Sequence, residues 1–299
     1  MISDNNPLIS YLGIPKTWAS EGFRISSHKD LLNLVTDLCK FNSSIKCKSV
    51  CIDSGEIDFD PSVFNSVIDE TDSETSSMLL EIQEITRREN LKIYFLVTKD
   101  YFLGSQIDNI FTSTNRFLSF IGGFLESIGV TYPSIIVRVG SAYGNRKDSM
   151  KIFCERVRSL DTVVSSKLCV MNDDKPSLFS VTDLLTGIYY DAGLPICFRT
   201  LAHHFNDGGL TIREALYLAS TTWTEGNSPL MIHSESRDIN SDGIFLSPLP
   251  SDELTMRIPT FGLRCEIILD SLGKELSYIN YLKNHKALPP IVINRISGK

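Results

Sequence analysis

Residues 134–147 read Ser-Ile-Ile-Val-Arg-Val-Gly-Ser-Ala-Tyr-Gly-Asn-Arg-Lys, and this stretch decides the fold. Residues 134–139 are mostly apolar and β-branched, which favours a strand covered on both faces. Gly140 and Gly144 then bracket a tight turn. Apolar residues recur at helical spacing from Met150 to Leu160. The stretch therefore predicts a strand, a turn and a helix, with one charge, Arg138, near the end of the strand.

The same alternation runs along the whole chain. Strands are expected at residues 8–14, 48–52, 91–97, 134–139, 167–171, 194–198, 229–233 and 263–269. Helices are expected between them, one capped by Asp30, one capped by Thr211, and one opened by Ser180 with Asp183 as a near capping box. Further helices are expected at residues 73–90, 106–128 and 273–284, and residues 17–27 are expected to form a loop.

Eight strand–helix alternations in 299 residues fit a (β/α)8 TIM barrel. A doubly wound sheet is the alternative. It would place a glycine-rich phosphate loop after the first strand, and Gly13-Ile14-Pro15 is not such a loop. We expect a single barrel domain over residues 1–282, followed by a basic tail over residues 283–299.

Composition excludes several classes of protein. The net charge of −7 argues against a chain held on nucleic acid by charge alone. It does not exclude a local basic groove. The seven cysteines mostly lie inside apolar runs without zinc spacing, and we expect buried thiols of an intracellular protein. We see no secretory signal and no 18-residue apolar run, so we expect no membrane contact and a cytoplasmic or nuclear location.

A barrel places its site at the carboxyl ends of its strands, so the residues there decide the function. In chain order these ends carry Asp53-Ser54, Thr98-Lys99-Asp100, Arg138, Asn172-Asp173-Asp174, residues 199–204, His233-Ser234-Glu235 and Asp270. Histidines and carboxylates that converge there are typical of a metal-assisted hydrolase. Lys99, Arg138 and Arg199 are cations and cannot be ligands.

The histidines leave two interpretations open. His203 and His204 are adjacent and point in different directions, so at most one faces the site, as a metal ligand or as a phosphate contact. The alternative is a histidine at a helix edge, bonded to backbone. His233 ends an apolar strand, which favours a role in the site. Residues 172–174 are equally compatible with a metal site and with an Asx turn.

In their order and spacing, these strand ends resemble the UV damage endonucleases, barrels of the xylose isomerase and endonuclease IV superfamily. The resemblance covers about residues 8–275. It is carried by residues 137–144, Asn172-Asp173-Asp174, residues 194–206 with their histidine pair, Thr222-Trp223, Ile232-His233-Ser234, and residues 266–275.

The resemblance implies a repair nuclease that cuts the DNA backbone beside a photoproduct, with divalent metals such as manganese or zinc. It implies metal ligands at His203, His204, His233, Asp173 and Asp270, of which His233 and Asp270 are catalytic. It implies DNA contacts at Lys99, Arg138, Tyr143, Asn172 and Arg199.

Several ligand positions of the family hold other residues in this chain. Its histidines and other ligands fall at Leu96, Arg138, Met171, Arg199 or Thr200, Met231 and Pro250. A cation such as Arg138 in place of a ligand repels a metal, and a lost ligand loosens the geometry of the others.

Three hypotheses follow from this pattern. The first is an active, divergent nuclease with a reduced metal site. The second is a degenerate member that keeps the barrel and acts in DNA binding or as a structural protein, and the substitutions favour it. The third, a sugar isomerase of the same superfamily, needs metal carboxylates of its own and fits less well. The oligomeric state is left open.

Overall fold

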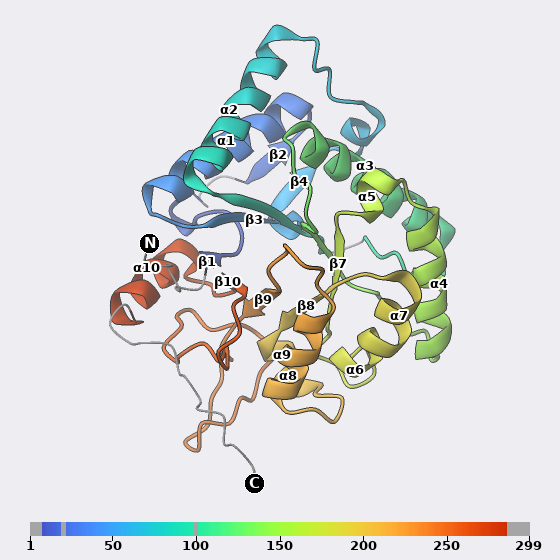
Figure 1. Cartoon of the computed structure of the whole chain (residues 1–299), viewed down its shortest axis with the longest axis vertical. Helices are drawn as coiled ribbons and strands as arrows, with labels where there is room; N and C mark the ends of the chain where they lie inside the picture. Colours follow the sequence, from blue (N-terminus) through green and yellow to red (C-terminus); the bar gives the residue numbers. More distant parts are fainter. Residues whose placement is uncertain (1–7, 19–21, 99–100, 286–299) are drawn as a thin grey trace.

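Each of the eight expected strands forms, and all eight pair in parallel in the computed structural model, which describes residues 8–18, 22–98 and 101–285 (Figure 1). Their order is β1 (Leu8–Tyr11), β10 (Glu266–Leu269), β9 (Leu230–His233), β8 (Ile196–Arg199), β7 (Leu168–Met171), β6 (Ile135–Val137), β5 (Lys92–Leu96) and β3 (Ser49–Asp53). The sheet closes where Leu12 bridges Cys51 in parallel and the Gly13 N–H donates to the Cys51 carbonyl at 2.7 Å. This closure confirms the TIM barrel and excludes the open, doubly wound sheet.

Helices cover the outside of the barrel. They are α1 (His28–Ser44), α2 (Ser73–Glu89), α3 (Asp108–Ser127), α4 (Arg146–Ser159), α5 (Thr162–Ser165), α6 (Val181–Leu184), α7 (Tyr190–Ala192), α8 (Thr200–Phe205), α9 (Ile212–Thr221) and α10 (Lys274–His285). A π-helical turn, Leu185–Tyr189, joins α6 to α7. Short 3-10 turns occur at Lys16–Trp18, Ser54–Glu56 and Pro61–Asn65. In Figure 1, α1 and α2 lie side by side at the top of the view.

Two details of the predicted N-terminal region are wrong. The residue that caps α1 is Ser27, and Asp30 is the third helical residue of a capping box, where its carboxylate accepts from the Ser27 N–H at 2.8 Å. The expected loop at residues 17–27 contains a strand, β2 (Phe23–Ile25), that pairs in parallel with β4 (Ile57–Phe59). These three-residue strands are too short to show a period of two in the sequence.

Other local predictions are confirmed. Ser180 and Asp183 form a reciprocal capping box at the start of α6, and Thr211 caps α9. The seven cysteines, which all lie in the described part of the chain, are buried free thiols. No helix among the described residues is long and apolar enough to cross a membrane.

The boundary between domain and tail stays a prediction. Residues 283–285 belong to α10 rather than to a tail, and residues 286–299 lie outside the described residues.

The core has two layers because alternate residues of each strand face opposite sides. The barrel interior is filled by Leu12, Cys51, Tyr94, Leu96, Ile136, Cys169, Met171, Cys197, Leu230, Ile232 and Ile268. The larger layer lies between the strands and the helices, and includes Phe95, Phe198, Met231 and Leu269. The interior layer determines which residues reach the mouth of the barrel.

Substitution of two adjacent glycines in α3, Gly122 and Gly123, tests how closely this helix packs on α5. A Cβ built on Gly122 lies 2.9 Å from Val164 Cγ2, whereas a Cβ on Gly123 has no atom within 4 Å. Alanine is favoured over glycine in a helix interior by about 1 kcal/mol. We expect Gly123→Ala to raise the free energy of unfolding by about that amount. We expect Gly122→Ala to gain nothing or to destabilise, because α3 must move away from α5. Urea unfolding of both variants measures the difference, and equal gains would contradict the packing.

Candidate functional site

Seven side chains enclose the carboxyl end of the barrel interior. They are Asp53, Thr98, Arg138, Asp173, Arg199, Ser234 and Asp270, here called the mouth ring. Each stands two positions after a residue that lines the interior, namely Cys51, Leu96, Ile136, Met171, Cys197, Ile232 and Ile268. Because strand side chains alternate with a period of two, all seven face the same space as those apolar residues.

Direct contacts link members of the mouth ring. Arg138 Nε lies 4.0 Å from Asp173 Oδ1, and Arg199 Nη2 lies 3.9 Å from Asp270 Oδ2. Ser234 Oγ donates to Asp270 Oδ2 at 3.2 Å. On the other side, the Thr98 hydroxyl donates to Asp53. Three carboxylates thus share the mouth with two guanidinium groups.

Burial shifts the pKa of Asp173, Asp270 and Arg138 in the mouth ring. Burial raises the pKa of Asp173 to about 6, although Arg138 and Arg199 oppose the shift. Burial also raises the pKa of Asp270, again against Arg199. Burial and the positive charge of Arg199 lower the pKa of Arg138, which Asp173 partly offsets. The ring is therefore a coupled set of charges at the top of an apolar barrel.

Asn172 and Thr200 hold the backbone that carries these charges. The Asn172 side chain accepts from the Arg199 N–H at 2.8 Å and donates to the Arg199 carbonyl at 3.1 Å. Asn172 is fully buried, and both of these hydrogen bonds fix the backbone of Arg199, while its predicted contact with DNA stays a prediction. Thr200 Oγ1 accepts from the Ser234 N–H at 3.3 Å and ties β8 to β9.

The predicted histidines lie outside the mouth ring. His233 shares the strand face of Met231, which packs in the outer layer, and its Nδ1 is 3.0 Å from Thr200 Oγ1. His203 Nε2 is 3.1 Å from the Leu210 carbonyl, and its ring packs on Phe198. His204 is exposed, with its ring against Phe245. The structure thus brings Asp173 and Asp270 to the mouth but not the three histidines.

The two remaining predicted DNA contacts are Tyr143 and Lys99. Tyr143 is 44% exposed on the turn that follows β6, with the positive φ of 44° that a bulky residue rarely adopts. Its phenol oxygen is 3.2 Å from Ser105 Oγ. Lys99 lies outside the described residues.

Comparisons with known proteins identify the family. The model of the UV-endonuclease UvdE family matches residues 66–244, more than half of the chain. The chain belongs to the UvdE family. A UV DNA damage endonuclease of Bacillus cereus (strain B4264) is 26% identical over 225 residues, which cover 73% of this chain and 69% of that protein. The corresponding protein of Bacillus pumilus is 25% identical over 160 residues, 52% of this chain and 49% of its own length.

Solved structures agree with the barrel fold of the UvdE family. The crystal structure of SacUVDE superposes with a TM-score of 0.75 at 20% identity, over 95% of this chain and all of that one. Endonuclease IV from Thermus thermophilus superposes with a TM-score of 0.55 at 14% identity, over 89% of this chain and 97% of its own. Both likenesses concern the fold.

The mouth ring does not fit the divalent metal cluster that the resemblance to the UvdE family implies. Within the described ranges, no three His, Cys, Asp or Glu side chains gather closely enough to hold one metal ion. A cation at the mouth would face the guanidinium groups of Arg138 and Arg199, and the ring contains no histidine. Guanidinium groups carry positive charge and donate only, so they repel a metal instead of binding it.

Three residues of the mouth ring can be identified from the period of two residues with which strand side chains alternate. These residues are Asp53, Thr98 and Ser234, which stand at strand ends but are not among the predicted site residues. Counting two positions from the apolar interior residue of each strand selects them, and the same count excludes His233 and Asn172.

His233 predicts a specific pH dependence of stability. It is 5% exposed, and burial lowers its pKa to about 4. The neutral imidazole therefore stabilises the fold fully above the unfolded pKa near 6.5, and this contribution is lost as the pH falls to 4. We expect the wild type to lose about 3 kcal/mol relative to His233→Asn between pH 7 and pH 4.

Urea unfolding of both proteins across this range measures the difference. The raised pKa of Asp173 acts with the opposite sign, because its contribution is lost as the pH rises through about 6. Both proteins keep Asp173, so that term cancels. Parallel curves for the two proteins would contradict a buried neutral His233.

Proposed function

We propose that this chain is a DNA-binding barrel of the UvdE family that has lost metal-dependent cleavage. The observation that carries the proposal is the mouth ring, in which Arg138 and Arg199 stand among carboxylates and no histidine is present. A metal-dependent nuclease needs bound cations that lower the pKa of a water. Arginine supplies positive charge but cannot coordinate a water for attack.

Arginine is well suited to bind a phosphate. Its planar guanidinium group matches phosphate oxygens, and phosphate contacts dominate the affinity of proteins for DNA. The side chain of Arg138 is 32% exposed and that of Arg199 is 13% exposed, so both reach the surface of the mouth. Tyr143 offers an exposed ring on the adjacent turn, suited to stack on a base. A DNA ligand also implies an intracellular location, cytoplasmic or nuclear.

The second candidate is an active UV damage endonuclease with a reduced metal site. The names of the Bacillus relatives favour it. It would rely on His233 and Asp270, with Asp173 and one of the adjacent histidines as further ligands. These groups would have to move together, because His233 and His203 contact the outer layer. Activity and metal binding separate the two candidates.

We expect the purified protein to leave ultraviolet-irradiated plasmid intact in the presence of manganese, and to bind no manganese tightly by calorimetry. Unirradiated plasmid is the control for contaminating nucleases. Nicking of irradiated plasmid that disappears in both His233→Ala and Asp270→Asn would establish the second candidate instead.

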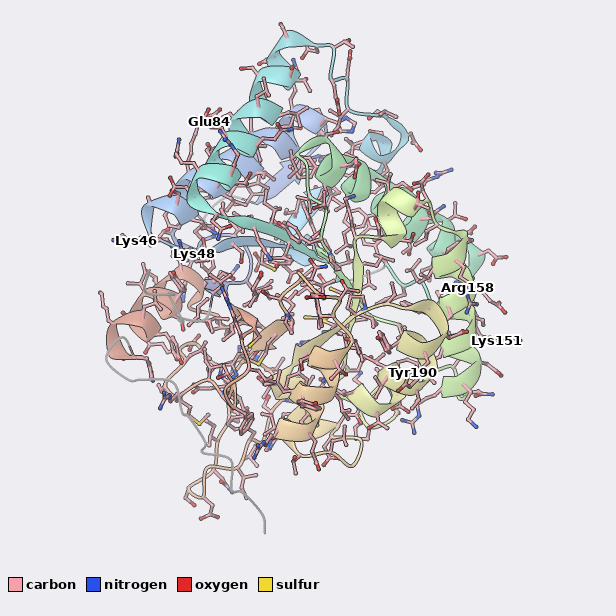
Figure 2. All side chains as sticks on the ribbon, viewed as in Figure 1. Lys46, Lys48, Glu84, Lys151, Arg158 and Tyr190 are labelled. Carbon is pink, nitrogen blue, oxygen red and sulfur yellow. The ribbon has the colours of Figure 1, made fainter. Side chains whose placement is uncertain are left out.

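We expect DNA binding that weakens with salt and falls about fivefold in Arg199→Gln or Arg138→Gln, because each removes one phosphate contact. Arg158→Gln is the matched control. Arg158 pairs with Asp191 on the outer face of α4, away from the strands (Figure 2). Fluorescence anisotropy with a labelled duplex measures the affinities. Equal losses in all three variants, or no binding by the wild type, would contradict a DNA site at the mouth.

A further inference from the structure

Asp173 lies between the two arginines of the mouth ring. Strands β6, β7 and β8 are neighbours, and they carry Arg138, Asp173 and Arg199 at their ends. Asp173 Oδ1 is 4.0 Å from Arg138 Nε, and the negative charge of Asp173 also acts on Arg199. The Asp173 side chain is only 3% exposed. One buried carboxylate is therefore shared by both cationic groups.

The contacts of Asp173 are incomplete. Among the described residues, its Oδ2 atom and Arg138 Nε are buried without a hydrogen-bond partner. The distance of 4.0 Å between the two side chains is too long for a hydrogen bond. Asp270, in contrast, accepts a hydrogen bond from Ser234. Buried polar groups are nearly always paired, so Arg138 keeps a donor that an anion in the place of the Asp173 carboxylate can use.

The backbone fixes Asp173 in this position. Its N–H donates to the Phe179 carbonyl at 2.9 Å, and its carbonyl accepts from Asn206 Nδ2 at 3.2 Å. Asn172 holds the backbone of Arg199 next to it. These contacts fix the backbone that carries the Asp173 side chain beside Arg138 and Arg199.

We propose that Asp173 is an internal competitor of phosphate, whose carboxylate takes the place between Arg138 and Arg199 that a phosphate group would occupy. Carboxylate and phosphate oxygens accept the same guanidinium donors, and two anions in one place repel each other. The inference rests on the proposed function for the identity of the phosphate as part of DNA. Asp173 then lowers the affinity of the site for phosphate. Its negative charge also offsets the positive charge of the two partly buried arginines.

The test uses Asp173→Asn, which keeps the shape of the side chain and removes its charge. The first probe is inorganic phosphate, followed by calorimetry. We expect Asp173→Asn to bind phosphate about tenfold more tightly than the wild type, the scale of coupling between close charge pairs. The gain is expected to vanish in the double variant Asp173→Asn/Arg138→Gln, because the competitor acts through that arginine.

Asp191→Asn is the matched control, because it removes an aspartate that pairs with an arginine on the outer surface. We expect it to leave phosphate affinity unchanged. Thermal unfolding without phosphate checks that each variant folds, and Asp173→Ser serves as a second variant with the same expected gain. A gain in neither Asp173 variant, or an equal gain in the control, overturns the inference.

Labelled duplex DNA is the second probe and separates this inference from the proposed function. If Asp173→Asn binds both phosphate and DNA more tightly than the wild type, both the inference and the proposed function are supported. A gain for phosphate without DNA binding by any variant supports the competitor and overturns the proposed function. The third outcome is DNA binding that depends on Arg199 but has equal affinity in the wild type and in Asp173→Asn, with no gain in phosphate affinity. That outcome supports the proposed function and overturns the competitor.

Discussion

The alternation of strand side chains in a closed barrel governs the rest of this structure. Each of seven strands places its last inward residue at one mouth, directly above apolar residues such as Ile136, Met171 and Ile232. Charges in this ring cannot be solvated from below. They must therefore neutralise one another or bind something from above. The long contacts between Arg138 and Asp173 and between Arg199 and Asp270 are the form that this neutralisation takes.

Positive charge held on side chains differs in its chemistry from positive charge held on metal ions. A metal polarises a phosphate oxygen and also activates a water, whereas a guanidinium group can only hold the oxygen. The donor set at this mouth therefore supports phosphate binding more directly than hydrolysis. Membership of the UvdE family accounts for the barrel, but the residues in the ring determine which chemistry its mouth can carry out.

The sequence predicted the eight strands well because each is a short apolar run bounded by polar or glycine residues. It placed Arg138, Asp173, Arg199 and Asp270 at strand ends, and all four lie in the ring. It could not tell which of two neighbouring residues at one strand end faces the interior, as with His233 beside Ser234. It also missed β2 and β4, because three residues carry no measurable period and their pairing is distant in sequence.

The outer layer still acts on the mouth through the backbone. His233 contacts Thr200, and Thr200 accepts a hydrogen bond from the Ser234 N–H. Asn172 accepts a hydrogen bond from the Arg199 N–H. Groups that face the helices thus set the positions of groups that face the interior. Polar side chains at buried outward positions therefore position the charged groups of the mouth ring. The inward residues carry the charge, and the outward residues fix the strand ends on which the charge stands. Arg199 lies at the junction, since β8 ends there and α8 begins at Thr200. Arg199 is therefore the residue at which the outward contacts of Asn172 and the inward contact with Asp270 meet.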